Sequence, residues 1–233
     1  MEGNPHYARQ GFSQEMESLE HDLLEMGSRA EAMVGQAVAS LVTLDSAMAY
    51  DVISKDDEID DCDIAIEERC LRLLALQQPM AGDLRVIGTA MKMITDIERV
   101  GDLAVDIAKV GLKVEKELGS TGYVDIPRMA SIAQMMFRQA LESFVKRDLE
   151  MVNAVCAQDD TADQLYRDLR GQIHESMRAN PEEVVAASWL LLAIHHIERI
   201  ADHAVNIAER VAFMVTGQLK QLATSHRSDM PDA

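Results

Sequence analysis

The amino-acid sequence predicts an all-α protein made of two three-helix bundles in tandem, each built from long antiparallel helices. The first observation is composition, since the chain has only five prolines and 4% aromatic residues and is rich in strong helix formers. The second is apolar residues that recur at helical spacing along the chain. The third is an internal repeat with an offset of about a hundred residues. We therefore expect bundles at residues 12–118 and 124–220, with flexible tails at residues 1–11 and 221–233.

The first half is expected to contain three helices. Apolar residues at helical spacing predict a first helix from Phe12 to about residue 53. A second helix starts in the acidic run at residues 55–61, because acidic side chains in a first turn complement the helix dipole. Pro79 ends this helix. A third helix then follows over residues 81–118.

The second half repeats this plan. Pro127 opens a helix whose apolar face reaches Val155, and a second acidic run follows at residues 158–163. Pro181 stands where the first half has its turn proline. The sequence Gly119–Gly122 is the one clear linker between the halves.

Regularly spaced carboxylates mark the third helix of each half. Glu98, Asp102 and Asp106 fall four residues apart, which predicts that they share one helical face. The pattern returns at Glu198 and Asp202. Like charges at this spacing repel each other, and a cation bound across them would reverse the sign of that energy.

A second set of carboxylates is expected to face the first. The second and third helices of each half form a hairpin about a proline, and residues equally far from such a turn lie at the same level. Acidic pairs four residues apart stand at matching distances on the two sides. The candidate metal ligands are Asp56, Asp60, Glu98, Asp102, Asp159, Asp163, Glu198 and Asp202.

The donor atoms indicate the kind of metal. Ligands that offer only oxygen suit hard cations such as magnesium, calcium, manganese or iron. His195, His196 and His203 could add nitrogen ligands in the second half, although His203 points about 100° away from Asp202 on a helix.

Other interpretations of these acidic faces stay open. They can be solvated surfaces of a scaffold without metal, and Arg99 and Arg199 are assigned to salt bridges with acidic neighbours. A metal-dependent phosphatase, or another hydrolase with a two-metal site, is an alternative function. It would need an open pocket, whereas these carboxylates lie on long helices.

Net charge limits the possible partners. A charge of −18 opposes binding to nucleic acid, which requires basic residues on phosphates, and docking on an anionic membrane. It suits cations or a basic protein partner. The apolar stretch 184–194 is too short to span a bilayer. Three cysteines without a Cys-x-x-Cys motif, and no N-terminal signal region, favour the cytoplasm.

Three segments resemble the PhoU family of phosphate-specific transport system accessory proteins. They are Gln78-Pro79-Met80-Ala81-Gly82-Asp83-Leu84-Arg85, the Glu98-Arg99-Val100-Gly101-Asp102 motif, and its repeat from Ile197 to Glu209. The likeness extends over roughly residues 12–220. It implies two three-helix bundles that form a homodimer and bind multinuclear metal clusters through the eight carboxylates named above. Iron or zinc is the metal that the resemblance favours, with manganese or magnesium as further candidates.

The resemblance also implies a function. Such proteins are not enzymes but negative regulators of phosphate signalling and uptake. They link the ATPase subunit of the phosphate ABC transporter to a sensor histidine kinase, which would recruit this cytoplasmic protein peripherally to the inner membrane. One departure is Asp106, where the family commonly carries asparagine, as Asn206 does in the second half. Asp106 is either an added ligand or an exposed charge, and the second interpretation is slightly favoured.

Overall fold

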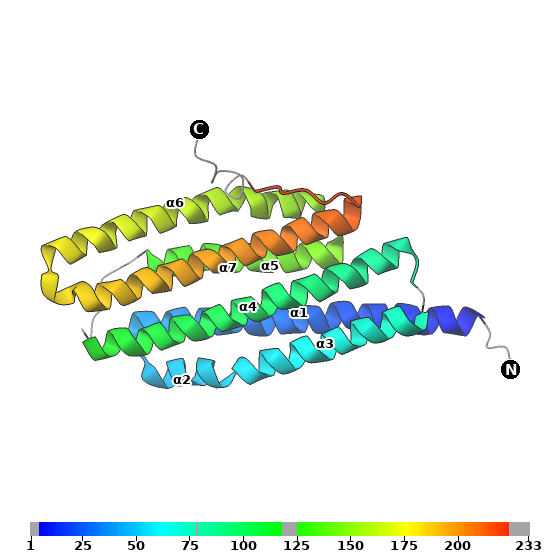
Figure 1. Ribbon diagram of the computed structural model, residues 1–233, viewed down its shortest axis with the longest axis horizontal. Helices are drawn as coiled ribbons and strands as arrows, with labels where there is room; N and C mark the ends of the chain where they lie inside the picture. The colour runs from blue at the N-terminus through cyan, green and yellow to red at the C-terminus, as the bar shows by residue number, and fades with distance from the viewer. Residues whose placement is uncertain (1–4, 78, 118–124, 224–233) are drawn as a thin grey trace.

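The structure, a computed structural model, describes residues 5–77, 79–117 and 125–223 (Figure 1). Over these ranges it contains helices and no strand. The helices are α1 (Pro5–Thr43), α2 (Ser46–Ser54), α3 (Asp56–Gln77), α4 (Ala81–Glu117), α5 (Ile126–Lys146), α6 (Leu149–Ala179), the short 3₁₀ helix η1 (Pro181–Glu183) and α7 (Val184–Thr216).

The helices form the two expected bundles. In the first, α2 and α3 together form one arm beside α1 and α4, and the second consists of α5, α6 and α7. The bundles lie side by side along their lengths, with α4 against α7 and α1 against α5 (Figure 1). Their buried side chains make one continuous hydrophobic core. The all-α, duplicated architecture is confirmed, and the two halves share an interior.

Each half contains a helix break that apolar periodicity did not predict. Leu44 and Arg147 have positive φ angles of 53° and 56°, in the left-handed region that ends helices. The next residue is an aspartate in each case, and its side chain caps the following helix. Asp45 accepts a hydrogen bond from the Met48 backbone N–H at 3.0 Å. Asp148 accepts one from the Glu150 N–H at 2.8 Å.

These breaks correct two expected helices. The first helix does not continue to residue 53, because it ends at Thr43 and α2 begins at Ser46. Likewise α5 ends at Lys146 and α6 begins at Leu149, so the acidic run at 158–163 lies inside α6. The apolar periodicity continues across each break because both helices face the same core.

The two ends of the described chain are more ordered than the expected tails. Helix α1 begins at Pro5, and residues 1–4 lie outside the described part. Residues 218–223, here called the C-terminal strap, run back beside α7. The Glu209 carboxylate accepts hydrogen bonds from the backbone N–H groups of Leu222 (2.6 Å) and Ala223 (3.4 Å). Residues 222 and 223 of the expected tail therefore contact α7, and 224–233 lie beyond the described range.

Helix α7 is long and largely apolar, and one of its faces is buried. Together with η1 it is long enough to span a bilayer, with a mean hydropathy of 1.4 over its best window, and half of that window is buried within the protein. It packs on α4, α5 and α6. Core helices of soluble proteins pass the same test of length and composition, so this feature is weak evidence for a membrane span.

Candidate functional site

The expected carboxylates of the first half influence one another electrostatically. Burial raises the pKa of Asp56, and the negative charges of Asp102 and Asp60 raise it further. Burial likewise raises the pKa of Glu98, with added repulsion from Asp102 and Asp60. Asp56 and Asp60 lie on α3, and Glu98 and Asp102 lie on α4, which packs against α3. The hairpin therefore brings both acidic pairs to one face, here called the first acidic face. Like charges crowded on a half-buried surface oppose ionisation.

Asp63 is a member of this face that the sequence analysis missed. Its negative charge contributes to the raised pKa of Glu98. Burial raises the pKa of Asp63 itself, as do the charges of Glu67 and Asp60. The sequence spacing could have predicted this position, because residues 56, 60 and 63 follow the i, i+4, i+7 pattern of one helical face.

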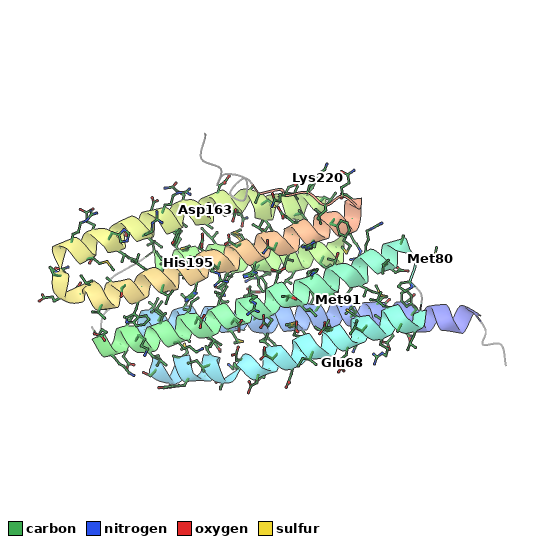
Figure 2. All side chains as sticks on the ribbon, in the orientation of Figure 1. Glu68, Met80, Met91, Asp163, His195 and Lys220 are labelled. Atoms are coloured by element: carbon green, nitrogen blue, oxygen red, sulfur yellow. The ribbon has the colours of Figure 1, made fainter. Side chains whose placement is uncertain are left out.

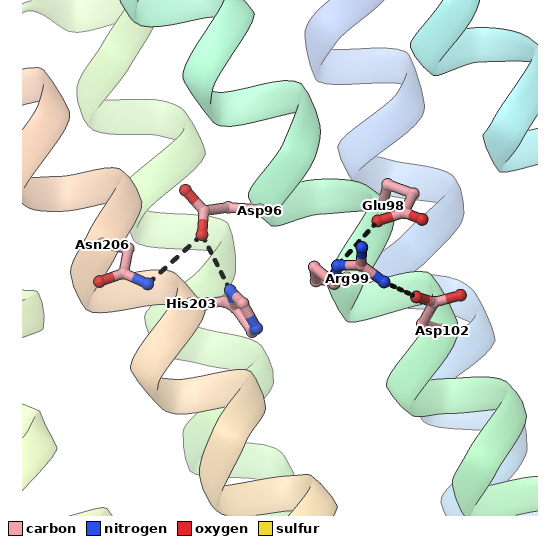
Figure 3. Close-up of polar contacts among 6 residues, drawn as sticks. All are labelled: Asp96, Glu98, Arg99, Asp102, His203 and Asn206. Atoms are coloured by element: carbon pink, nitrogen blue, oxygen red, sulfur yellow. Dashed lines mark hydrogen bonds and ion pairs between the residues drawn. The ribbon is translucent and has the colours of Figure 1, made fainter.

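Arg99 neutralises part of the first acidic face. Its Nε lies 3.4 Å from Glu98 Oε2, and its Nη1 donates a hydrogen bond of 2.6 Å to Asp102 Oδ2 (Figure 3). The assignment of Arg99 to salt bridges is thus confirmed, and its partners are two of the expected ligands. Lys109 also places a positive charge near Asp56, which lowers the pKa of that carboxyl against the larger opposing effects. A cation at this face would compete with both basic side chains.

Asp106 does not belong to the first acidic face. Its carboxylate lies 3.7 Å from Lys109 Nζ, and its charge acts on His196 of α7. A helix advances about 40° beyond a full turn every four residues, so the carboxylates at 98, 102 and 106 drift round the helix. The expectation that all three share one face is therefore wrong. The alternative of a surface charge agrees with a side chain that is 47% exposed.

The second acidic face lies between α6 and α7. Asp159 is buried, at 1% exposure, and Asp163 and Glu198 are largely covered. Burial raises the pKa of Glu198, and the negative charges of Asp202 and Asp163 add to the effect. Asp163, Glu198 and Asp202 therefore influence one another, whereas the charge of Asp159 acts on Cys156.

Histidine and tyrosine side chains distinguish the second face from the first. His195 Nδ1 lies 3.1 Å from Glu198 Oε2, and the His195 and Tyr166 rings have centroids 6.2 Å apart. Asp163 and His195 lie at the same level of the α6–α7 hairpin (Figure 2). Of the three expected histidines, His195 contacts the expected ligand Glu198. His196 is buried at the contact with α4.

His203 joins the two halves instead of the acidic face. Its Nδ1 lies 2.8 Å from Asp96 Oδ1 on α4, and Asn206 Nδ2 donates to the same oxygen at 3.3 Å (Figure 3). Asp96 and His203 are only 17% and 15% exposed. This cluster lies across the α4–α7 contact, where the partly buried Asp96 carboxylate receives two hydrogen bonds.

The metal prediction is not settled by this arrangement. Within the described ranges, no three His, Cys, Asp or Glu side chains are placed together as a metal ion would require. The donor chemistry does fit a metal, since carboxylate oxygens at the first face suit hard cations and His195 adds a nitrogen donor at the second. The buried Oε1 of Gln158 has no hydrogen-bond partner in the described part of the chain, beside Asp159. The ligand set stays a prediction.

The fold and its duplicated acidic hairpins define a class of helical, internally repeated protein, and comparison with known proteins identifies it. The PhoU domain family model matches residues 23–110 and again 126–211. The chain therefore belongs to the PhoU family.

Several relatives match over nearly their whole length. The chain is 36% identical to the "Phosphate-specific transport system accessory protein PhoU homolog" of Clostridium acetobutylicum, over 90% of this chain and 96% of the relative. It is 35% identical to the Pseudomonas aeruginosa homolog of the same name, over 91% and 88%. The crystal structure of PhoU from P. aeruginosa superimposes with a TM-score of 0.84 at 35% identity, covering 89% of this chain and all of the other. The phosphate transport system regulatory protein PhoU from Streptococcus pneumoniae gives 0.83 at 30% identity, covering 90% of this chain and 99% of the other.

Proposed function

We propose that this protein is a negative regulator of phosphate uptake and of the phosphate-starvation response. The single observation that carries the proposal is the match of both halves to the PhoU domain. Relatives that align over nearly their whole length are named accessory or regulatory proteins of phosphate transport. A role as an accessory protein rather than an enzyme follows from the same names.

The mechanism that we propose is that of an adaptor. The protein would contact the ATPase subunit of a phosphate ABC transporter and a sensor histidine kinase, and would form a homodimer. Partner binding through its surfaces suits a rigid, continuous helical core, because a rigid scaffold presents two docking surfaces in a fixed relation. A negative charge of −18 favours basic surfaces on those partners.

We further propose that the two acidic faces bind metal. At the first face Asp56, Asp60, Glu98 and Asp102 would hold a cation, with Asp63 adjacent, and Arg99 would have to release its carboxylates. At the second face Arg167 Nη1 lies 3.6 Å from Asp163 Oδ2, so this basic side chain would likewise compete with a cation.

The second face offers Asp159, Asp163, Glu198 and Asp202, with His195 as a nitrogen donor. A mixed oxygen and nitrogen donor set suits iron, zinc or manganese better than magnesium. Bound metal would supply positive charge that offsets the repulsion among these acids. That charge would stabilise the fold by mass action.

A complementation experiment tests the regulatory function. The protein is expressed in a bacterium that lacks its own PhoU protein and carries a reporter for the phosphate-starvation response. We expect the reporter to be repressed in high phosphate and released on starvation. Co-purification with the ATPase subunit and the kinase, compared with an unrelated helical bundle of similar charge, tests the adaptor mechanism. A reporter that stays fully active in high phosphate, with the protein well expressed, contradicts the proposal.

The hydrolase alternative is tested separately. The metal-loaded protein is assayed for phosphatase activity beside a variant in which Glu198 and Asp202 are both changed to amides. Turnover by the wild type that the variant lacks would favour the hydrolase. We expect no difference between them.

A further inference from the structure

Two cavities lie along the α4–α7 contact at equivalent places in the two halves. One, here called the strap cavity, has a volume of about 530 Å³ and is lined by Asp96, Asn206, Glu209 and the C-terminal strap. The other, the lysine cavity, has a volume of about 240 Å³. With the offset that relates Glu98 to Glu198, Asp106 corresponds to Asn206, Lys109 to Glu209, and His196 to Asp96. The residues that line the lysine cavity include Asp106, Lys109, Lys113, Trp189, Leu192 and His196.

In the strap cavity the two carboxylates have hydrogen-bond partners within the protein, and Arg210 and Lys220 also line it. Asp96 contacts His203 and accepts a hydrogen bond from Asn206. Glu209 accepts hydrogen bonds from the backbone of the strap. Internal stabilisation therefore explains the two carboxylates and Asn206.

The lysine cavity has a different polar character. Lys109 Nζ is 3.7 Å from Asp106 Oδ1, which is an ion pair but too long for a good hydrogen bond. Lys113 Nζ lies 6.0 Å from the centroid of the Trp189 ring. Two exposed ammonium groups against one carboxylate give this cavity a net positive charge in a chain of −18.

His196 forms a buried wall of the same cavity. It is 7% exposed, and its Nδ1 is buried without a hydrogen-bond partner among the described residues. Leaving a buried polar atom unpaired costs free energy, typically about 1–3 kcal/mol. Burial lowers the pKa of His196, which keeps the ring neutral near pH 7. The ring thus adds an uncharged wall beside Trp189 and Leu192.

We propose that the lysine cavity binds a small organic anion of the nucleotide class. Lys109 and Lys113 would bind the phosphate group through charge-assisted hydrogen bonds. The flat base would lie against Trp189, because aromatic faces stack on bases of any sequence. Asp106 would accept a hydrogen bond from a hydroxyl or amino group of the ligand. A bare phosphate would leave the apolar wall at Trp189 and Leu192 uncovered. This ligand site is separate from the regulatory role proposed above.

Trp189 makes the proposal testable, because it is the only tryptophan in the chain. Its fluorescence is followed during titration with AMP, and binding is measured in parallel by calorimetry. We expect saturable binding by AMP, and binding weaker by at least about tenfold for inorganic phosphate or for adenosine alone, since each lacks one recognised group.

Lysine substitutions test the position of the site. Lys109→Met combined with Lys113→Met should weaken AMP binding by at least about tenfold. Both side chains are exposed, so the variant should fold, and its melting temperature verifies that it does. Lys146→Met on α5, which removes an exposed lysine paired with Glu142, should bind AMP as the wild type does.

Three outcomes would overturn the proposal. They are the absence of saturable AMP binding at millimolar concentrations by both methods, inorganic phosphate binding as tightly as AMP, or the double lysine variant binding AMP like the wild type. The complementation result is independent of all three, so the regulatory function can stand if this site fails.

Discussion

Glu198→Gln should affect the stability of the metal-free and metal-loaded protein in opposite directions. Glu198 is 22% exposed and lies four residues before Asp202 on α7. Removing its charge relieves repulsion from Asp202 and Asp163, worth about 0.2–0.5 kcal/mol per pair. It also loses the contact with His195, worth about 0.5 kcal/mol or less. The metal-free variant should therefore unfold about 1 °C higher than the wild type, or at least no lower.

Metal should reverse this order. An ion at a hundred times its dissociation constant stabilises the wild type by about 2.7 kcal/mol, which is about 5–10 °C for a chain of this size. The variant lacks one ligand and should gain much less. Thermal unfolding is followed by circular dichroism in chelator and then with added zinc or manganese. Glu142→Gln, which removes an exposed acid paired with Lys146, should respond to metal as the wild type does.

The pH dependence of the same variant provides a second readout. The pKa of Glu198 is raised in the folded protein, so the folded state binds its proton more readily than the unfolded state does. The ionised carboxylate lowers the free energy of unfolding at neutral pH. This destabilisation disappears as pH falls through the raised pKa toward the ordinary value. The stability difference between metal-free Glu198→Gln and wild type should shrink over that interval. A variant that is less stable than wild type in chelator, with no pH dependence of the difference, would refute the repulsion argument.

Three further substitutions test the packing and capping of the helices, with the free energy of unfolding measured by urea denaturation. Asp96→Ala leaves His203 without its partner across the halves and should lower the free energy of unfolding by about 1–3 kcal/mol; an unchanged value would remove this contact as a stabilising link. Gly111→Val should cost about 1–3 kcal/mol or more, because a Cβ at Gly111 would lie only 3.3 Å from Leu41 Cα, and full stability would show that α1 and α4 can separate cheaply. Asp148→Ala should cost about 1 kcal/mol through loss of the helix cap, whereas no loss would mean that the break does not depend on the cap.

Sequence periodicity predicted the helical class of the fold, and the turn prolines predicted the register of the hairpins. Pro79 and Pro181 mark turns between helices whose apolar stripes are continuous, and equal distances from a turn fix which carboxylates meet. The four expected acids of the first half, and Asp163, Glu198 and Asp202 of the second, therefore influence one another's pKa values.

The helix breaks after Thr43 and Lys146 could not be predicted from periodicity. The left-handed positions are occupied by Leu44 and Arg147, not by the glycine or asparagine that usually signals such a turn. Only the aspartates that follow carry a capping signal, and a single aspartate in a helical pattern is weak evidence.

Contacts between the two halves could not be predicted from the sequence. A repeat predicts two similar bundles, but it does not say which faces of α4 and α7 meet. The pairing of Asp96 with His203 depends on that packing, as does the position of Asp106 beside Lys109 and His196. Spacing alone placed Asp106 with the acidic face, because the drift of an i+4 series round the helix becomes important only at its third member.

Metal content per chain tests the central claim most directly. The protein is purified without a metal-affinity tag and analysed by elemental mass spectrometry, beside a variant of the first face (Glu98→Gln with Asp102→Asn) and one of the second (Glu198→Gln with Asp202→Asn). We expect iron, zinc or manganese in the wild type and a loss of metal from each variant, because each removes two of the four expected carboxylates of its face. Wild-type protein that stays free of metal after titration with these ions, or variants that retain the wild-type content, would contradict the proposal that the acidic faces are metal sites.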